Sequence, residues 1–379
     1  MGGGLMQLVA YGAQDIYLTG NPQITFFKVV YRRHTNFAME SVDQTLNGTA
    51  SAGNKVTATI SRNGDLVGRM YLEMKVNLGG TDGNNSGHTA IDNVEVQIGG
   101  QQIDKHFGHW MEAWAELTEP NSAGLVGTVT AGSGTKFQNL AMAGGLFTAA
   151  NSNAKTCRVP LQFWFNRNPG LALPLIALQY HEVKVMITFA SVTSVADAEL
   201  WADYIYLDTD ERRRFAQVSH EYLIEQVQHT SGTGTSVDLN FNHPVKELVW
   251  CGEVGATGGR TALSTGNTKV VLNGHDRFAE RPLEYFTQTQ VWQHHTGTPV
   301  QCDTSSSGIG KASTDEIAVY SFALKPEEHQ PSGTCNFSRI DNAQLKMASN
   351  ASNAIVNIYA VNYNVLRVMS GMGGLAYSN

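Results

Sequence analysis

The stretch FAMESVDQT at residues 37–45 returns in altered form as YLIEQVQHT at residues 222–230. In both copies an aromatic residue, an apolar residue, Glu, Val and Thr occupy the same five places. Apolar and polar residues that alternate over such a short segment are typical of a half-buried β-strand. A strand that occurs in both halves of the chain indicates that the chain contains two related units.

Further matches follow the two copies in the same order along the chain. Residues 56–60 match 237–241, 66–67 match 248–249, 96–100 match 270–274, and 204–206 match 358–361. Each match is weak by itself, and the shared order is what carries the inference. It indicates an ancient duplication of one β-unit of roughly 180 residues, a period far longer than that of a solenoid repeat.

Each unit is long enough to bury a core of its own. It has room for about eight short strands and long loops, which favours a jelly roll over an open sheet. We therefore predict an all-β fold of two tandem eight-stranded jelly rolls with short helices in the loops. The predicted boundaries are 1–24 for an N-terminal arm, 25–210 for the first jelly roll and 211–379 for the second. The charged cluster between Asp208 and Ser219 interrupts the strand pattern there.

Individual elements can also be predicted from apolar spacing. Alternation predicts strands at 56–60, 69–76, 94–98, 181–189 and 354–366. Asn63-Gly64 predicts a tight hairpin after the first of these strands. One segment has helical spacing instead, with Phe107, Trp110, Met111, Trp114 and Leu117 on one face and Pro120 at its end. We interpret this aromatic stripe as core packing.

The composition excludes several classes of protein. Charged residues make up 16% of the chain and there are 38 glycines, which suits strands and turns better than long surface helices. The net charge of −7 argues against direct nucleic-acid binding, which requires a surplus of Lys and Arg. The four cysteines are far apart and have no zinc-ligand spacing, so we expect reduced thiols. No apolar run is long enough to predict a transmembrane segment.

Several blocks of sequence resemble one known family. They lie at both ends and in the middle of the chain, at 20–28, 31–37, 207–215, 324–339, 363–367 and 371–379. In these blocks the chain resembles the major capsid proteins of nucleocytoplasmic large DNA viruses, which include phycodnaviruses, iridoviruses and mimiviruses. The resemblance implies a structural protein with two jelly rolls per subunit. It also implies homotrimers of pseudo-hexagonal outline and an icosahedral shell over an internal membrane.

The resemblance sets expectations about partners and location. The expected partners are other copies of the chain in a homotrimer, neighbouring capsomers, and minor capsid and penton proteins. The expected location is the virion capsid, assembled in the host cytoplasm with an inner membrane nearby. Residues 1–20 have no counterpart in the second half, so we predict an arm that lies beneath the capsomer. Two long loops, 79–89 and 118–155, are predicted contact elements, the second at the top or seam of the trimer.

The sequence contains no arrangement that is typical of catalysis or metal binding. His106 and His109 lie three apart and His294 and His295 are adjacent, but none has further ligands at fixed spacing. Glu327-Glu328 are neighbours and do not form the separated carboxylate pair of a glycosidase. No nucleophile elbow, phosphate-binding loop or dinucleotide fingerprint occurs. We therefore predict no enzyme activity, no catalytic, cofactor-binding or metal-binding residues, and no cofactor.

Alternatives remain open at the level of the whole protein and of two segments. One alternative is a lectin on the same fold, and exposed aromatic residues on a loop would favour this function. Another is a glycosidase, which an assay for substrate turnover would detect. Residues 325–339 are either a contact loop between subunits or a rigid turn fixed by Pro326 and Pro331. Residues 208–214 are either an interdomain clamp of Arg–carboxylate pairs or a solvated linker.

Overall fold

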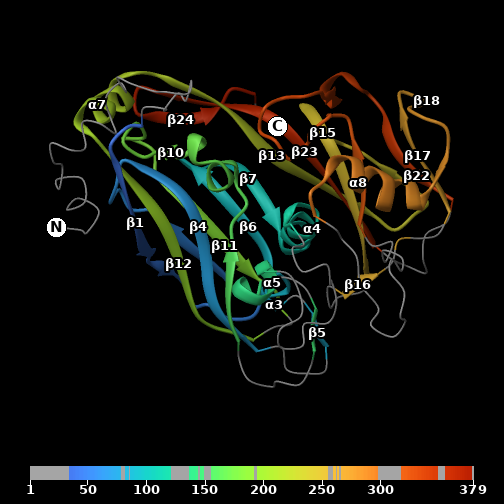
Figure 1. The fold of residues 1–379 in the computed structure, drawn as a ribbon, viewed down its shortest axis with the longest axis horizontal. Coiled ribbons are helices and arrows are strands. Elements are labelled where there is room, and N and C mark those ends of the chain that lie inside the picture. Colours follow the sequence, from blue (N-terminus) through green and yellow to red (C-terminus); the bar gives the residue numbers. More distant parts are fainter. Residues whose placement is uncertain are drawn as a thin grey trace, which may run out of the picture.

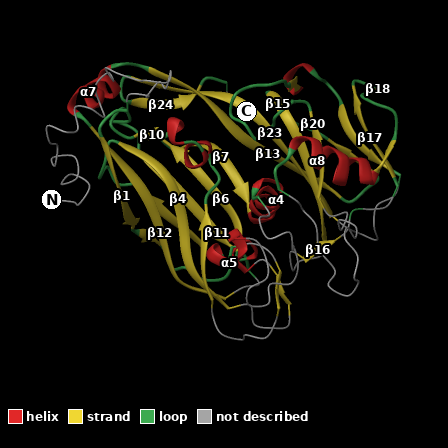
Figure 2. Ribbon diagram, viewed as in Figure 1, coloured by secondary structure: helices red, strands yellow, loops and turns green. Residues whose placement is uncertain are grey.

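The structure is a computed structural model in which two β-sandwiches lie side by side (Figure 1). It describes residues 34–77, 82–84, 86–120, 136–143, 146–148, 155–191, 194–254, 259–261, 263, 266–297, 317–348 and 355–377. The predicted arm, residues 1–24, lies outside the described residues, as do parts of the loops 79–89 and 118–155. Strands dominate the described chain, and the helices are short and lie in connections between strands (Figure 2).

The first jelly roll is built from ten paired strands. They are β1 (Phe37–Gln44), β2 (Leu46–Asn47), β3 (Lys55–Thr59), β4 (Leu66–Asn77), β6 (Ile91–Ile98), β7 (Gln101–Phe107), β9 (Lys155–Pro160), β10 (Leu173–Pro174), β11 (Val183–Phe189) and β12 (Ser194–Leu207). Its connections contain α3 (Ser86–Thr89), α4 (Gly108–Thr118), α5 (Lys136–Ala141), α6 (Trp164–Arg167), a helical turn at Pro169–Leu171, and the pair β5 (Asp82–Asn84) and β8 (Leu146–Thr148).

The second jelly roll follows the linking helix α7 (Thr209–Gln217). Its strands are β13 (His220–Gly232), β14 (Ser236–Asp238), β15 (Pro244–Val254), β16 (Gly259–Thr261), β17 (Asn267–Leu272), β18 (His275–Asp276), β19 (Arg281–Pro282), β20 (Ile317–Ser321), β21 (Cys335–Asn336), β22 (Ala343–Met347), β23 (Ile355–Met369) and β24 (Met372–Leu375). Helical segments occur at Tyr285–Thr289, α8 (Gln290–His294) and Phe337–Arg339.

The two units have the same strand order. One sheet of the first jelly roll runs β1-β12-β4, with β9 and β10 also paired to β4, and its counterpart runs β13-β23-β15, with β20 and β21 paired to β15. The opposing sheets run β3-β11-β6-β7 and β14-β22-β17-β18. Each unit is therefore a sandwich of two sheets in which equivalent strands pair in the same order. This confirms the predicted double jelly roll, and the segments at 37–45 and 222–230 occupy equivalent strands, β1 and β13.

The duplicated turn residues have the same backbone conformation in both units. Gly99 and Gly100 join β6 to β7 with φ of 58° and 83°, and Asn273 and Gly274 join β17 to β18 with φ of 49° and 79°. Two successive residues at positive φ form the tight turn whose twist matches that of a hairpin. Glycine and asparagine tolerate this conformation with little strain.

The predicted hairpin at Asn63-Gly64 is wrong. β3 pairs with β2 and β11, whereas β4 pairs with β12, β9 and β10, so the chain crosses from one sheet to the other between them. Gly64 serves a different purpose, because a Cβ atom there would lie 2.9 Å from Cβ of Tyr204. The glycine allows the crossing chain to approach the buried Tyr204.

The cores lie between the two sheets of each unit, as the strand pattern predicts. In β11 the side chains of Val183, Val185, Ile187 and Phe189 are buried, and the residues between them are partly exposed. The second core contains Trp250, Phe286 and Leu345. The described part of the chain contains no helix that is long and apolar enough to cross a membrane.

Candidate functional site: the interface between the two jelly rolls

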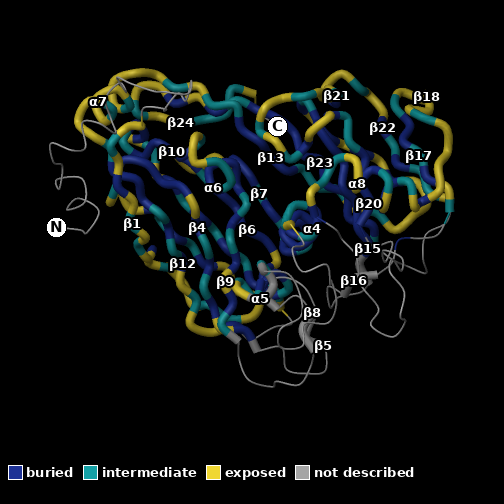
Figure 3. Tube along the Cα trace, in the orientation of Figure 1, coloured by how far each residue is buried: buried dark blue, intermediate teal, exposed yellow. Residues whose placement is uncertain are grey.

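Helix α4 of the first jelly roll packs against the second jelly roll. Its residues Trp110, Trp114 and Leu117 form one buried apolar cluster with Val249 and Tyr359 of the β13-β23-β15 sheet. Figure 3 shows α4 as a buried element between the two halves of the molecule. The aromatic stripe is therefore packing, as its spacing predicts, but it fills the interface between domains rather than the core of one domain.

Strand β7 continues this interface with hydrogen bonds to β13. The backbone amide of Val227 donates to Oδ1 of Asp104 at 3.0 Å, and the side-chain amide of Gln226 donates to the carbonyl of Ile103. Oδ2 of Asp104 also lies 2.9 Å from Nε2 of His106, and both side chains are buried. His106 is therefore paired with a buried carboxylate of its own strand.

A buried group of charges crosses the interface around Glu225 of β13. Arg167 of the first jelly roll lies 2.6 Å from one carboxylate oxygen of Glu225, and Lys246 of β15 lies 2.6 Å from the other. His329 lies 3.6 Å from Glu225. Burial alone would raise the pKa of Glu225, but Arg167, His329 and Lys246 outweigh it and lower the pKa to about 2. Glu225 therefore stays ionised and links both jelly rolls.

A second buried pair lies at the end of α4. His295 is 3.1 Å from Glu247 of β15 and 3.0 Å from Glu327. Glu327 also accepts hydrogen bonds from the amide and the hydroxyl of Thr296. Burial alone would lower the pKa of His295, but the two carboxylates outweigh it and raise the pKa to about 9. His295 is therefore a buried cation at neutral pH.

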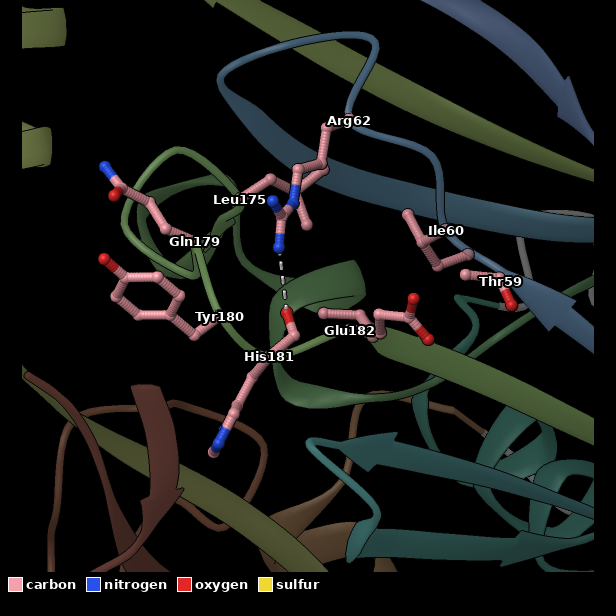
Figure 4. A pocket seen from close by; sticks show the side chains of 9 residues that line it. Thr59, Ile60, Arg62, Leu175, Gln179, Tyr180, His181 and Glu182 are labelled. Atoms are coloured by element: carbon pink, nitrogen blue, oxygen red, sulfur yellow. Dashed lines mark hydrogen bonds between the residues drawn. The ribbon is translucent and has the colours of Figure 1, made fainter. Parts of the chain in front are cut away.

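The opposite end of the interface joins the β23–β24 turn to the first jelly roll. The amide of Tyr180 donates to the carbonyl of Gly371 at 2.9 Å, and Nδ1 of His181 lies 2.9 Å from the carbonyl of Gly373. Arg62 donates to the carbonyls of Leu178 and His181 beside a pocket of about 310 Å³ (Figure 4). Tyr180, which also lines this pocket, is 76% exposed.

Among the described residues, the segment 208–214 contacts the first jelly roll. Asp208 accepts a hydrogen bond from the amide of Thr209 at the start of α7, and Arg212 lies 3.0 Å from Asp65 at the start of β4. Phe215 packs beside Leu66 and Ile205 of the first jelly roll. These contacts hold the linking helix to the first unit.

The segment 325–339 takes part in the interface within one chain. Glu327 contacts His295, and His329 contacts Glu225. The hydroxyl of Tyr363 donates to the backbone carbonyl of His329. The amide of Lys325 donates to Ser332 Oγ, which closes the turn. The sequence pattern alone did not indicate that two side chains of this turn, Glu327 and His329, reach buried charged groups.

The described residues were expected to hold no metal-binding site. They contain no group of three or more His, Cys, Asp and Glu side chains that could hold a metal ion. Of the histidines singled out in the sequence, His295 is committed to Glu247 and Glu327, and the partly exposed His294 lies 3.2 Å from the carbonyl of Leu324. Both belong to the architecture of the second jelly roll.

These observations define a class of protein: a subunit of two equivalent jelly rolls joined by a buried interface. Comparisons identify the family. Residues 25–208 match the model of the major capsid protein N-terminus, and residues 211–374 match the model of the large eukaryotic DNA virus major capsid protein. The chain belongs to the major capsid protein family of large eukaryotic DNA viruses.

Individual relatives agree with this assignment. The chain is 55% identical to the major capsid protein of Pyramimonas orientalis virus and 42% identical to that of Paramecium bursaria Chlorella virus 1, in each case over all of both chains. Among solved structures, the PBCV-1 capsid model has a TM-score of 0.76 at 37% identity and covers 94% of this chain and 100% of that one. The Faustovirus major capsid protein, at 11% identity and a TM-score of 0.65, shares the fold.

The chain is thus a structural protein of the virion capsid rather than an enzyme, as the resemblance implies. Self-association follows from this role, because a capsid is built from copies of its major protein. The resemblance carried by the sequence blocks is confirmed by relatives that align over the full chain.

Proposed function

We propose that three copies of the chain form a closed homotrimer of pseudo-hexagonal outline, which acts as the capsomer of an icosahedral shell. The observation that supports this proposal is the equal strand order of the two jelly rolls within one chain. Three such subunits supply six similar wedges around one threefold axis. Closed cyclic symmetry satisfies every interface without open-ended growth.

Exposed apolar side chains on both units support contacts with neighbouring copies. Trp292 and Leu324 of the second jelly roll are 80% and 76% exposed, and Phe37 and Met39 of β1 are each 47% exposed. Large aromatic and aliphatic side chains are enriched at protein interfaces. A permanent interface between capsomer subunits would bury more than about 2,000 Å² in total.

Light scattering on dilute purified protein tests the oligomeric state. We expect a mass close to three chains at micromolar concentration, and thermal unfolding whose midpoint rises with protein concentration. The matched variants Trp292→Ala and Arg213→Ala remove exposed side chains, and only the first should promote dissociation. A monomer mass that persists at micromolar concentration, with unfolding independent of concentration, would overturn the proposal.

We further propose the finer assignments that the sequence predicts. Residues 1–24 form an arm, 25–210 the first jelly roll and 211–379 the second; the limits of the two family matches support this division. The arm lies beneath the capsomer and faces neighbouring capsomers or the inner membrane. The further partners of the capsomer are minor capsid and penton proteins. Assembly takes place in the host cytoplasm.

A further inference from the structure

A short segment of the second jelly roll presses against the end of helix α4. This segment, residues 295–297, directly follows α8 and is called the His295 segment below. The amide of Gly297 donates to the carbonyl of Leu117 in the last turn of α4 at 2.7 Å. The approach is so close that a Cβ atom at Gly297 would lie 2.3 Å from the carbonyl oxygen of Glu116. The backbones of the two jelly rolls are therefore in direct contact here.

The imidazole of His295 occupies a fully buried position behind this contact. Its side chain has no exposed surface, and neither has the side chain of Glu247. The edge of the ring faces the indole of Trp114, with ring centroids 6.5 Å apart. Arg167 lies over the same indole at 4.9 Å. Trp114 of the first jelly roll thus lies against two of the cationic side chains at the interface, Arg167 and His295.

The charges around His295 come from three elements. β15 contributes Glu247, and the turn at 325–339 contributes Glu327, whose side chain is 22% exposed. α4 contributes the indole of Trp114 and the carbonyl end of the helix, which favours a nearby cation. Among the described residues, Arg167 and Lys246 form ion pairs with Glu225, and Lys246 also interacts electrostatically with Glu247.

Glu247 depends on His295 for charge compensation. A carboxylate without solvent exposure is strongly unfavourable unless a cation is close to it. Within the described chain, His295 is the cationic group that lies within ion-pair distance of Glu247, at 3.1 Å. A neutral imidazole would leave Glu247 buried beside another carboxylate, Glu327. The buried arrangement is therefore compatible with the protonated form of His295 and not with the neutral form.

We propose that protonated His295 locks the two jelly rolls at a fixed angle, and that its deprotonation in alkaline solution releases the His295 segment from α4. The lock lies within one chain, so it operates whether or not the homotrimer forms. It fixes the angle between the two wedges of a capsid subunit, and alkaline pH would loosen that angle before either β-sandwich core unfolds.

The direction of the pH effect follows from the two states of the histidine. In the unfolded chain its pKa has the ordinary value of 6.5, and in the folded chain the carboxylates raise the pKa to about 9. The folded state therefore holds the proton more tightly. The stabilisation is fully present below pH 6.5 and is lost as the pH rises through about 9.

Hydrogen–deuterium exchange of the full chain tests the proposal at the amide of Gly297. Protection is expressed relative to the intrinsic exchange rate at each pH. For the wild type we expect the greatest protection at about pH 6 and a progressive loss above pH 6.5 that reaches at least about tenfold by pH 9.5. Peptides from the central strands β4 and β15 should keep their protection over the same range. Protection of Gly297 that stays constant to pH 9.5 would overturn the proposal.

Substitutions distinguish the contribution of the His295 charge to the protection of Gly297 from the contribution of side-chain packing. His295→Gln should lose the Gly297 protection at all pH values, because Glu247 is left uncompensated. The double variant Glu247→Gln/His295→Gln removes both charges and should recover most of the protection without its pH dependence. His294→Gln, at the adjacent partly exposed histidine, should behave like the wild type. A double variant that is no better protected than His295→Gln would contradict the lock.

A further variant covers the case in which His295→Gln does not fold. Glu247→Gln keeps the histidine but removes one of the carboxylates that hold its proton. The alkaline loss of protection should then move to lower pH by at least about one unit. An unchanged transition in Glu247→Gln would show that another group titrates, and would overturn the proposal.

Discussion

Arg167 of the first jelly roll donates to Glu225 of the second across a distance of 2.6 Å. The side chain of Glu225 is only 5% exposed, and Lys246 on the neighbouring strand β15 contacts its other oxygen at the same distance. Two cations and one carboxylate thus share a water-poor space at the interface. Such a group of charges stabilises the fold less than apolar packing does. A change in the angle between the domains that moved the charges apart would nevertheless be unfavourable, because it would leave a buried charge without its partner.

The first prediction concerns removal of this carboxylate. Glu225→Gln preserves the shape of the side chain and leaves the buried Lys246 ammonium without its partner. We expect the free energy of unfolding to fall by about 3–5 kcal/mol, the usual effect of breaking a buried ion pair on one side. Denaturant unfolding followed by fluorescence measures it.

The matched control lies on the same strand. Glu221 of β13 contacts Arg367 at 2.8 Å, but both side chains are about half exposed. Glu221→Gln should change the free energy of unfolding by less than about 1 kcal/mol, because exposed ion pairs contribute little. Equal effects of the two variants would show that the buried network contributes no more than a surface pair.

A second prediction is an acid-dependent loss of stability from the same residue. The pKa of Glu225 is 4.5 in the unfolded chain and about 2 in the folded chain. A lowered pKa means that the stabilisation is present above pH 4.5 and is lost as the pH falls through about 2. The difference in unfolding free energy between the wild type and Glu225→Gln should therefore shrink in this range. A difference that stays constant down to pH 2 would contradict the assignment.

The fold could be predicted from the sequence to a large extent because it depends on local patterns that occur twice. Alternating apolar residues located β3, β6 and β11, and the paired turn residues at 99–100 and 273–274 recur in equivalent hairpins. The crossing at Asn63-Gly64 was mistaken for a hairpin, because the same turn residues serve both purposes. Which sheet a strand joins depends on contacts with residues far away in the sequence, such as Tyr204.

The interface could not be predicted in the same way. Glu40 and Glu225 occupy the same place in the repeated stretch, yet Glu40 is partly exposed and Glu225 is buried among cations. The difference arises because the first jelly roll covers β13, and no neighbour within the described chain covers β1 in that way. A charge pattern in one strand does not contain this information. The available signal was the adjacent Lys246-Glu247 directly before the apolar run 248–251 of β15; both charged side chains are buried.

A third prediction uses two neighbouring glycines at the β6–β7 turn. A Cβ atom at Gly99 would lie 2.4 Å from Nδ1 of His181, whereas one at Gly100 would have no atom within 4 Å. Both residues have positive φ, so either alanine variant should cost about 1 kcal/mol from the backbone. Gly99→Ala should cost more, because it also displaces His181 from Gly373 of the second jelly roll. Thermal unfolding compares them, and equal midpoints would show that the His181 contact is dispensable.

A fourth prediction concerns the N-terminal segment. Deletion of residues 1–20 should leave soluble trimers but impair shell assembly, because the segment has no counterpart in the second jelly roll. Light scattering reports the trimers and electron microscopy reports the shells. A truncated protein that fails to fold would show that the segment belongs to the core of the first jelly roll.

The last prediction compares two tryptophans that differ in burial. Trp114 of α4 is 4% exposed and fills the interface between the jelly rolls, whereas Trp292 of α8 is 80% exposed. Trp114→Ala removes the surface that both Arg167 and His295 contact, and should lower the free energy of unfolding by about 3–5 kcal/mol. Trp292→Ala should alter the unfolding of the single chain by less than about 0.5 kcal/mol, because exposed side chains lose little on truncation. Denaturant unfolding is measured at protein concentrations low enough for the trimer to be dissociated, so that the effect on the single chain is separated from the effect on assembly. If Trp114→Ala were as mild as Trp292→Ala, the interface would not depend on α4, and the angle between the jelly rolls would have to be fixed by the hydrogen bonds of β7 and of the β23–β24 turn.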